Sequence, residues 1–218
     1  METEVKLSFK DKESLFKFAE SDLIRGLCVN SVDVKPCLLE NSYLDTSGLT
    51  VSGRGGMVRV RHCSGEDVDE YEFTVKCGGN TTDGLHQRCE WNVKSDSGIF
   101  SISDFKLKSI ASADPAELLD SLFDGIQDED LAVMCCNSFN RTVYELCYGS
   151  SKIEACFDSG IIMGADPLKT EEICELELEL VEGDVSDLNQ LSEMFIKAAD
   201  CQPLDNTKFR RTLALAMG

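Results

Sequence analysis

The sequence predicts an α+β protein in which an eight-stranded antiparallel sheet closes into a β-barrel and helices pack on its outside. Three observations predict this class. Eight segments alternate apolar and polar residues with the period of two that is typical of strands. Short glycine-containing segments between some of them are typical of hairpin turns, which join antiparallel neighbours. Eight strands are enough to close a barrel around side chains or one small ligand.

The predicted elements follow one another through a single domain, residues 1–218. The strands are expected at residues 2–9, 42–45, 57–63, 70–77, 87–93, 139–147, 152–158 and 173–180. Hairpin turns are expected at residues 80–84 and 148–151. Helical periodicity predicts helices at residues 13–21, 102–111, 115–123, 187–199 and 208–217. Asp114 and Pro115 are typical of a helix start, with Asp114 as the N-cap.

The composition excludes two kinds of partner. The chain has 21 Lys and Arg residues against 40 Asp and Glu residues, which gives a net charge of −19 at pH 7. Such a chain repels nucleic-acid backbones and anionic membrane surfaces, so neither is expected as a partner. No apolar run approaches the roughly 18 residues of a membrane span, and the acidic N-terminal residues do not resemble a signal peptide. Eleven scattered cysteines without a CxxC pair predict reduced thiols and a cytoplasmic protein.

Sorting each predicted strand by parity separates an apolar face from a face with clustered charge. The charged faces contain Glu2, Glu4 and Lys6; Arg59 and Arg61; Glu72 and Lys76; Arg88 and Glu90; Lys152, Glu154 and Asp158; and Glu175, Glu177 and Glu179. A single solvated sheet face would show the same alternation, but like charges side by side destabilise a face unless something compensates them. Inside a barrel, the carboxylates would bind a hard divalent cation and the basic groups would bind phosphate oxygens. A metal-bridged polyphosphate would satisfy both sets.

In chain order these motifs resemble the CYTH superfamily, the triphosphate tunnel metalloenzymes. Residues 2–6 are similar to the N-terminal ExExK signature of that family, and residues 58–61 to its paired-arginine strand. The other matching segments are residues 73–76, 88–90, 139–141, 153–160, 174–180 and 207–211. One departure is Thr207, where the family more usually has Ser before the lysine.

Residues 84–93 and 173–180 resemble the bacterial inorganic triphosphatases in particular. Many of those proteins carry a second, histidine-rich helical domain called CHAD, which these 218 residues lack. The chain is therefore expected to correspond to the catalytic domain, either as a whole protein or as part of a longer one.

The resemblance implies roles for the charged residues. One or two Mg²⁺ or Mn²⁺ ions would be surrounded by Glu2, Glu4, Asp158, Glu175 and Glu177. Glu179 shares their face but lies nearer the strand end, so it ranks lower. The triphosphate would be bound by Lys6, Arg59, Arg61, Lys76, Arg88, Arg141 and Lys208. The catalytic candidates are Glu4, Lys6, Glu177 and Lys208.

The activity that the resemblance implies is metal-dependent hydrolysis of inorganic triphosphate to pyrophosphate and phosphate, by an inorganic triphosphatase. Hydrolysis of nucleoside or thiamine triphosphates and a class IV adenylate cyclase remain alternatives with the same site. A non-catalytic polyphosphate-binding module is a further alternative, although pure anion binding would need only the basic residues. Neither His62, on the outward parity, nor His86, at a strand edge, is expected to act as an acid or base.

Overall fold

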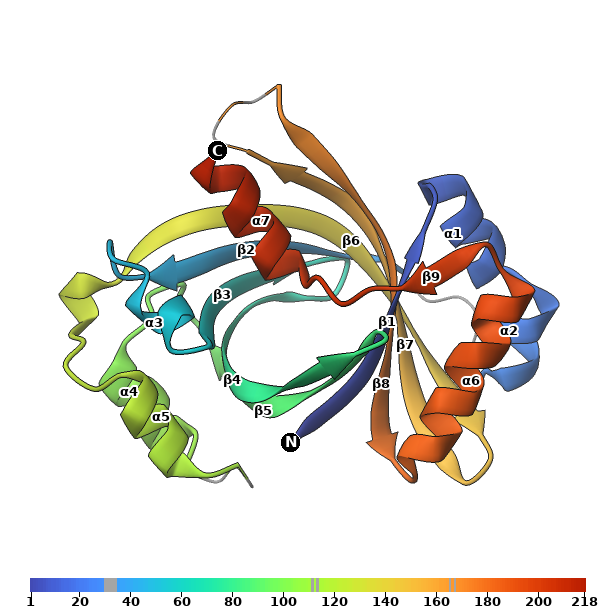
Figure 1. The fold of residues 1–218 in the computed structure, drawn as a ribbon, viewed down its shortest axis with the longest axis horizontal. Helices are drawn as coiled ribbons and strands as arrows, with labels where there is room; N and C mark the ends of the chain where they lie inside the picture. Colours follow the sequence, from blue (N-terminus) through green and yellow to red (C-terminus); the bar gives the residue numbers. More distant parts are fainter. Residues whose placement is uncertain (30–34, 111, 113, 165, 167) are drawn as a thin grey trace.

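A computed structural model describes residues 1–29, 35–110, 112, 114–164, 166 and 168–218 of the chain (Figure 1). The strands are β1 (Glu2–Phe9), β2 (Cys37–Asp45), β3 (Gly56–Ser64), β4 (Asp69–Thr82), β5 (Leu85–Ser95), β6 (Ala132–Tyr148), β7 (Ser151–Met163), β8 (Thr170–Glu182) and β9 (Cys201–Pro203). They form one sheet in the order β5-β4-β3-β2-β6-β7-β8-β1-β9, and β1 also pairs with β5. The pairing of β1 with β5 closes the eight strands from β1 through β8 into an antiparallel barrel, which confirms the predicted fold class.

The short strand β9 continues the edge of β1 where β5 leaves it. β5 pairs with residues 2–5 of β1, whereas β9 pairs with residues 7–9. The segment that leads from β9 into the last helix is thereby fixed beside the barrel, since the Leu204 amide donates to the Lys6 carbonyl. This places the start of the last helix near the ExExK strand.

The helices lie mainly on the outside of the barrel (Figure 1). They are α1 (Lys12–Ala19), α2 (Asp22–Leu27), α3 (Thr50–Gly53), α4 (Ile102–Lys108), α5 (Ala116–Leu122), the 3₁₀ helix η1 (Asp128–Asp130), α6 (Val185–Ala198) and α7 (Lys208–Met217). Within the described ranges, no helix combines the length and the apolar character that crossing a membrane requires.

Two apolar cores join the outer face of the barrel to these helices. In the first, Leu7 and Leu176 of the strands pack with Leu15 of α1 and Phe195 of α6. In the second, apolar residues of β3, β4 and β5 such as Trp91 pack with residues of α4 and α5. The strand residues in both cores have the parity opposite to the charged residues, so the charged faces point into the barrel as predicted.

The last helix, α7, adds a feature that the parity pattern does not reveal, because it packs against the inner face of the barrel (Figure 1). Phe209 and Leu213 pack against Tyr43 and Met57, whose side chains share the inward parity. Leu215 packs at a second inner cluster of apolar side chains from β2, β6, β7 and β8. Part of the barrel interior is therefore filled by α7 and not by ligand space.

The element boundaries differ from the predictions in places where the alternation carries no charge. Strands β2 and β6 begin at Cys37 and Ala132, earlier than predicted, and the predicted helix at residues 102–111 ends at Lys108, with residue 111 outside the described residues. The prediction of Asp114 as a helix cap was wrong. Pro115 is the N-cap of α5, and the Asp114 carboxylate instead accepts the Glu90 amide (2.9 Å) and pairs with the N-terminal ammonium.

A β-bulge in β4 gives a test of the barrel wall. The β4–β5 register shifts between Cys77 and Asn80, and Gly79 there has a φ of 94°. A Cβ at Gly79 would collide with the carbonyl oxygen of Gln87. We expect Gly79→Ala to lower the free energy of unfolding by about 1–3 kcal/mol in urea denaturation. Gly53→Ala, where a Cβ meets open space, is the control, and equal effects of the two changes would contradict this account.

Candidate functional site

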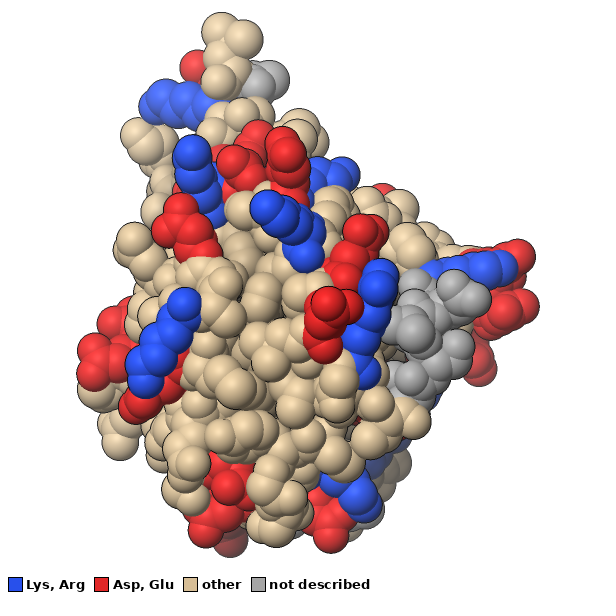
Figure 2. Space-filling view, turned by 90° about the vertical axis from the view of Figure 1, so that its right-hand side faces the viewer, with Lys and Arg blue, Asp and Glu red and all other residues tan. Residues whose placement is uncertain are grey.

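A polar chamber of about 190 Å³ lies inside the barrel. Its wall comes from seven strands and the first turn of α7, and all of these strands except β2 contribute charged residues. The charged lining residues are Glu2, Glu4, Lys6, Arg59, Arg61, Glu72, Lys76, Arg88, Glu90, Arg141, Glu177, Glu179 and Lys208. By contrast, the outer face over α1, α2 and α6 shows basic and acidic side chains interspersed around an uncharged centre (Figure 2).

One side of the chamber has more positive charge than its own acids compensate. Burial, together with the nearby Arg59 and Arg141 guanidinium groups, lowers the pKa of Arg61 to about 10. Arg59 donates to Thr74 (2.8 Å) and to Glu72, but its buried Nε has no hydrogen-bond partner within the described part of the chain. A bound anion would relieve the repulsion among these groups and supply the missing acceptor.

The other side has more negative charge than its bases compensate. Glu179 lies beside Glu4 across the β1–β8 pair and, among the described residues, makes no hydrogen bond or ion pair. Burial and the Glu2 and Glu90 carboxylates raise its pKa to about 7. Carboxylate oxygens are the ligands that hard divalent cations such as Mg²⁺ or Mn²⁺ prefer, so the chemistry of these side chains fits the expected metal.

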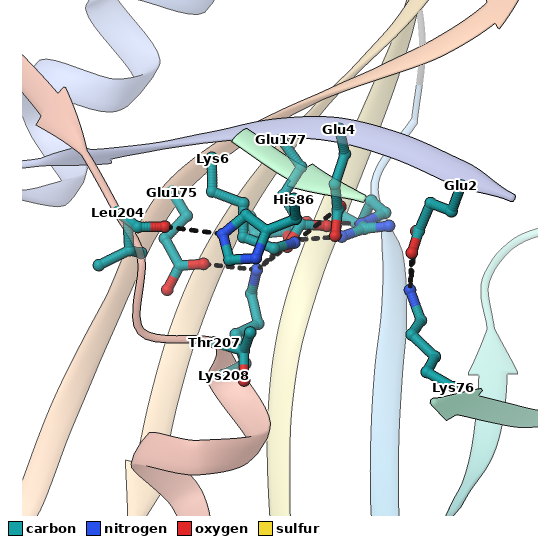
Figure 3. A network of polar contacts seen from close by, with 12 residues as sticks. Glu2, Glu4, Lys6, Lys76, His86, Glu175, Glu177, Leu204, Thr207 and Lys208 are labelled. Atoms are coloured by element: carbon teal, nitrogen blue, oxygen red, sulfur yellow. Dashed lines mark hydrogen bonds and ion pairs between the residues drawn. The ribbon is translucent and has the colours of Figure 1, made fainter. Parts of the chain in front are cut away.

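Between the two sides lies a dense network of ion pairs. Lys6 donates to Glu4 (2.7 Å) and to Glu177. Lys208 reaches in from the start of α7, with its Nζ 2.8 Å from Glu177 and 2.7 Å from Glu175 (Figure 3). Burial alone would raise the pKa of Glu177, but Lys208, Lys6 and Arg141 hold it well below its usual range. Glu177 therefore stays ionised at the centre of three cations.

A second group of ion pairs occupies the opening near β4 and β5. Lys76 Nζ lies 2.7 Å from both Glu2 and Glu90, and Arg88 donates to Glu4 at 2.8 Å. Burial alone would raise the pKa of Glu90, but Lys76 lowers it to about 2. Glu90 thus stays ionised at neutral pH, and the acids of this group hold the two bases against the chamber wall.

The structure brings most of the predicted site residues together. The predicted residues that line the chamber are Glu2, Glu4, Lys6, Arg59, Arg61, Lys76, Arg88, Arg141, Glu177 and Lys208. Asp158 and Glu175 are buried beside it but contact bases, since Arg141 binds Asp158 (2.7 Å) and Lys208 lies near both. In the described part of the chain, no three acidic, His or Cys side chains converge as they would around an ion. The metal ligand set stays a prediction.

Lys152 was expected in the lining of the chamber but does not lie there. The β6–β7 register runs without a shift from Lys152 to Asp158, so Lys152 keeps the inward parity, but it lies near the start of β7, away from the residues that line the chamber. Its side chain is exposed and binds Glu182 at 2.7 Å on the surface.

Several site residues were missed because they carry no clustered charge or lie on the inserted helix. Asn41 and Asn137 are buried in the interior and hydrogen-bond to each other, but amides give no signal in a charge pattern. Arg211 binds Glu171 and Glu175 from α7. Its spacing of three from Lys208 places both on one helical face, which could have identified it.

His86 has a structural environment. Its Nε2 lies 3.0 Å from the Leu204 carbonyl and its Nδ1 3.1 Å from the Thr81 hydroxyl (Figure 3). Burial lowers its pKa, so the ring is held neutral. It links the β4–β5 hairpin to the segment that leads into α7.

A closed antiparallel barrel whose interior holds separate acidic and basic sides defines the class of protein. A family model described as the CYTH domain matches residues 1–213, and the chain belongs to this family. An inorganic triphosphatase of Haemophilus influenzae is 27% identical over 150 residues. The match covers 69% of this chain and 38% of that protein, so the chain spans well under two thirds of its relative's length.

Solved structures show the same fold. A Hippeastrum protein described as having a dominant triphosphatase activity superposes with a TM-score of 0.67, at 16% identity, over 99% of this chain and 97% of that one. A protein of Bacillus halodurans, described as a candidate adenylate cyclase, gives a TM-score of 0.56 at 18% identity, over 97% and 98% of the two chains.

Proposed function

We propose that this protein hydrolyses inorganic triphosphate to pyrophosphate and phosphate with Mg²⁺ or Mn²⁺. The observation that carries the proposal is the division of one enclosed chamber into a basic side around Arg61 and an acidic side around Glu179. A linear polyanion that arrives with a divalent cation compensates both. A family relative named as an inorganic triphosphatase supports the proposal.

The basic residues would bind the triphosphate along the chamber. Arg59, Arg61 and Arg141 present guanidinium groups, which suit bidentate contacts to phosphate oxygens. The lysines and Arg88 would add point charges where charge develops on the transferred phosphoryl group and on the pyrophosphate that leaves. The barrel wall separates the chamber from bulk water, which strengthens these contacts.

The acidic residues would hold the cation. Glu2, Glu4, Glu177 and Glu179 line the chamber, and Asp158 and Glu175 stand behind them. When bound, the cation supplies charge neutralisation at phosphate oxygens as a Lewis acid. Lys6 and Lys208, which pair with these carboxylates in the structure, would then turn towards the phosphates. The same two lysines and Glu4 and Glu177 remain the proposed catalytic residues.

The aromatic residues of the lining favour inorganic over nucleoside or thiamine substrates. The aromatic rings in the chamber wall belong to Tyr43, Phe139 and Phe209. Tyr43 and Phe209 pack on each other with centroids 5.0 Å apart, and the Lys208 ammonium lies 5.2 Å from the Phe139 centroid. Each of the three rings thus already has a packing partner, which argues against stacking on a base or a thiamine ring. All eleven cysteines are free, which supports activity in a reducing compartment such as the cytoplasm.

A phosphate-release assay tests the function. Triphosphate, ATP, thiamine triphosphate and pyrophosphate are compared at equal concentration with Mg²⁺, with Mn²⁺ and with EDTA. We expect triphosphate to be the best substrate and EDTA to abolish release, because the carboxylates of the acidic side would repel a polyanion that arrives without its cation. A better rate with ATP or thiamine triphosphate would overturn the substrate assignment. Tight triphosphate binding without turnover would favour the polyphosphate-binding module.

A further inference from the structure

A chain of uncharged side chains runs behind the basic side of the chamber. Arg61 Nε donates to Asn41 Oδ1 (2.8 Å), and Asn41 Nδ2 donates to Asn137 Oδ1 (3.0 Å). Asn137 Nδ2 donates to the Thr212 hydroxyl (2.8 Å), which donates to the Lys208 carbonyl (2.7 Å). This chain of hydrogen-bonded side chains thus connects β3, β2 and β6 to the first turns of α7.

The direction of these hydrogen bonds is fixed at both ends. A guanidinium group can only donate, so Asn41 must turn its oxygen to Arg61 and its NH₂ group to Asn137. The Lys208 carbonyl can only accept, so the Thr212 hydroxyl must donate there and accept from Asn137. Asn41 and Thr212 are almost completely buried, and an unpaired polar group there costs about 1–3 kcal/mol. Arg61 and α7 are therefore held in one arrangement.

This chain of hydrogen-bonded side chains carries no charge, which matters in a protein with 40 acidic residues. The carboxylate closest to Arg61 is Glu72, whose Oε1 lies 3.6 Å from Nη1 and is shared with Arg59. Asp in place of Asn41 would fit the same space and would accept the same bond from Arg61. It would also neutralise the guanidinium group, whereas the amide orients it and leaves its charge uncompensated.

We propose that Asn41 and Asn137 are positioning residues of the triphosphate site, which orient Arg61 and fix α7 through uncharged oxygens so that the Arg61 charge remains available to phosphate. The proposal rests on the proposed function, because it assumes that the chamber binds triphosphate. It predicts that an acid at position 41 weakens triphosphate binding without a matching loss of thermal stability. A role in folding alone predicts that both change together.

The test replaces Asn41 by Asp and measures triphosphate binding by calorimetry without metal, together with thermal unfolding. We expect the dissociation constant to rise by about tenfold or more, because hydrogen bonds between charged groups contribute on that scale. The melting temperature should change little, because the new ion pair with Arg61 offsets the donor that Asn137 Oδ1 loses. Asn140→Asp is the matched control, because Asn140 is exposed on the same β2–β6 pair and adds the same charge.

A second pair of variants tests the link to α7. Thr212→Val keeps the shape but removes the hydroxyl, whereas Thr212→Ser keeps it. We expect Thr212→Val to raise the KM for triphosphate several-fold and Thr212→Ser to leave the KM near the wild-type value. If the wild-type chain binds triphosphate but Asn41→Asp and Asn140→Asp bind it equally, the positioning role is wrong and the proposed function stands. If the wild type neither binds triphosphate nor releases phosphate from it with Mg²⁺ or Mn²⁺, both are wrong.

Discussion

Glu177→Gln is expected to reduce the turnover number for triphosphate by about 10²–10³-fold, the scale seen when one electrostatic contact to a transition state is removed. Glu177 contacts Lys6, Lys208 and Arg141, and it lines the chamber where the cation is proposed to bind. A glutamine keeps one oxygen but removes the charge that holds three cations and attracts the metal. The loss should appear in metal-dependent phosphate release.

The KM separates this role from general damage to the site. Removing one acid from a chamber that binds an anion makes the chamber more positive, so triphosphate should bind equally well or more tightly. We therefore expect a lower turnover number without a higher KM. Glu182→Gln is the control, because Glu182 lies on the same strand but pairs with Lys152 on the surface. Turnover within twofold of the control would contradict the assignment of Glu177.

Glu4→Gln should have an effect in the same direction. Glu4 is buried, binds Lys6 and Arg88, and lies directly across from Glu179. If Glu4→Gln and Glu177→Gln both kept full metal-dependent activity, the proposed metal side would be wrong. The triphosphate-binding residues would not be affected by that result.

The fold was predictable because charged and apolar side chains alternate in the central part of most strands. Each of the eight barrel strands was found, and the bounds of β1 agree with the prediction, whereas β2 to β8 extend further than predicted. In β6 the residues from Ala132 to Ser138 alternate without charge, so the pattern there is too weak to define a strand. The short elements α2, α3, η1 and β9 contain too few residues for any periodicity to show.

The site was predictable to the extent that a side chain's direction follows from strand parity. Parity placed Arg59, Arg61 and the acids of β1 and β8 inside, and the structure has them there. It failed at Lys152, because parity gives the face of a strand but not how far along the strand the chamber extends. It also could not show that α7 packs inside, since the helix has the same amphipathic pattern whichever apolar surface it covers.

The position of Lys208 contradicts a local rule and thereby indicates its importance. A cation in the first turn of a helix faces the positive end of the helix dipole, which is unfavourable. Lys208 begins α7 and is buried, yet Asp158, Glu175 and Glu177 all lie within 2.8 Å of its Nζ. Burial opposes its charge, but the carboxylates raise its pKa above the ordinary value.

The pH range of this contribution follows from the direction of the shift. The pKa of Lys208 is higher in the folded than in the unfolded chain, where lysine titrates near about 10.4. Its ion pairs therefore contribute their full stabilisation at neutral pH, and this is lost only as the pH rises through the folded-state pKa. A comparison of variants at pH 7 measures the whole contribution.

At that pH, Lys208→Met is expected to lower the free energy of unfolding by about 3–5 kcal/mol, because it leaves buried carboxylates without their central cation. Turnover should fall as well, since Lys208 is one of the proposed triphosphate ligands. Urea denaturation measures the first effect, with Lys197→Met as the control on an exposed lysine. Mg²⁺ should stabilise Lys208→Met more than the wild type, because it can replace the missing charge among Asp158, Glu175 and Glu177. Equal stabilisation by Mg²⁺ would argue that these acids do not bind the metal.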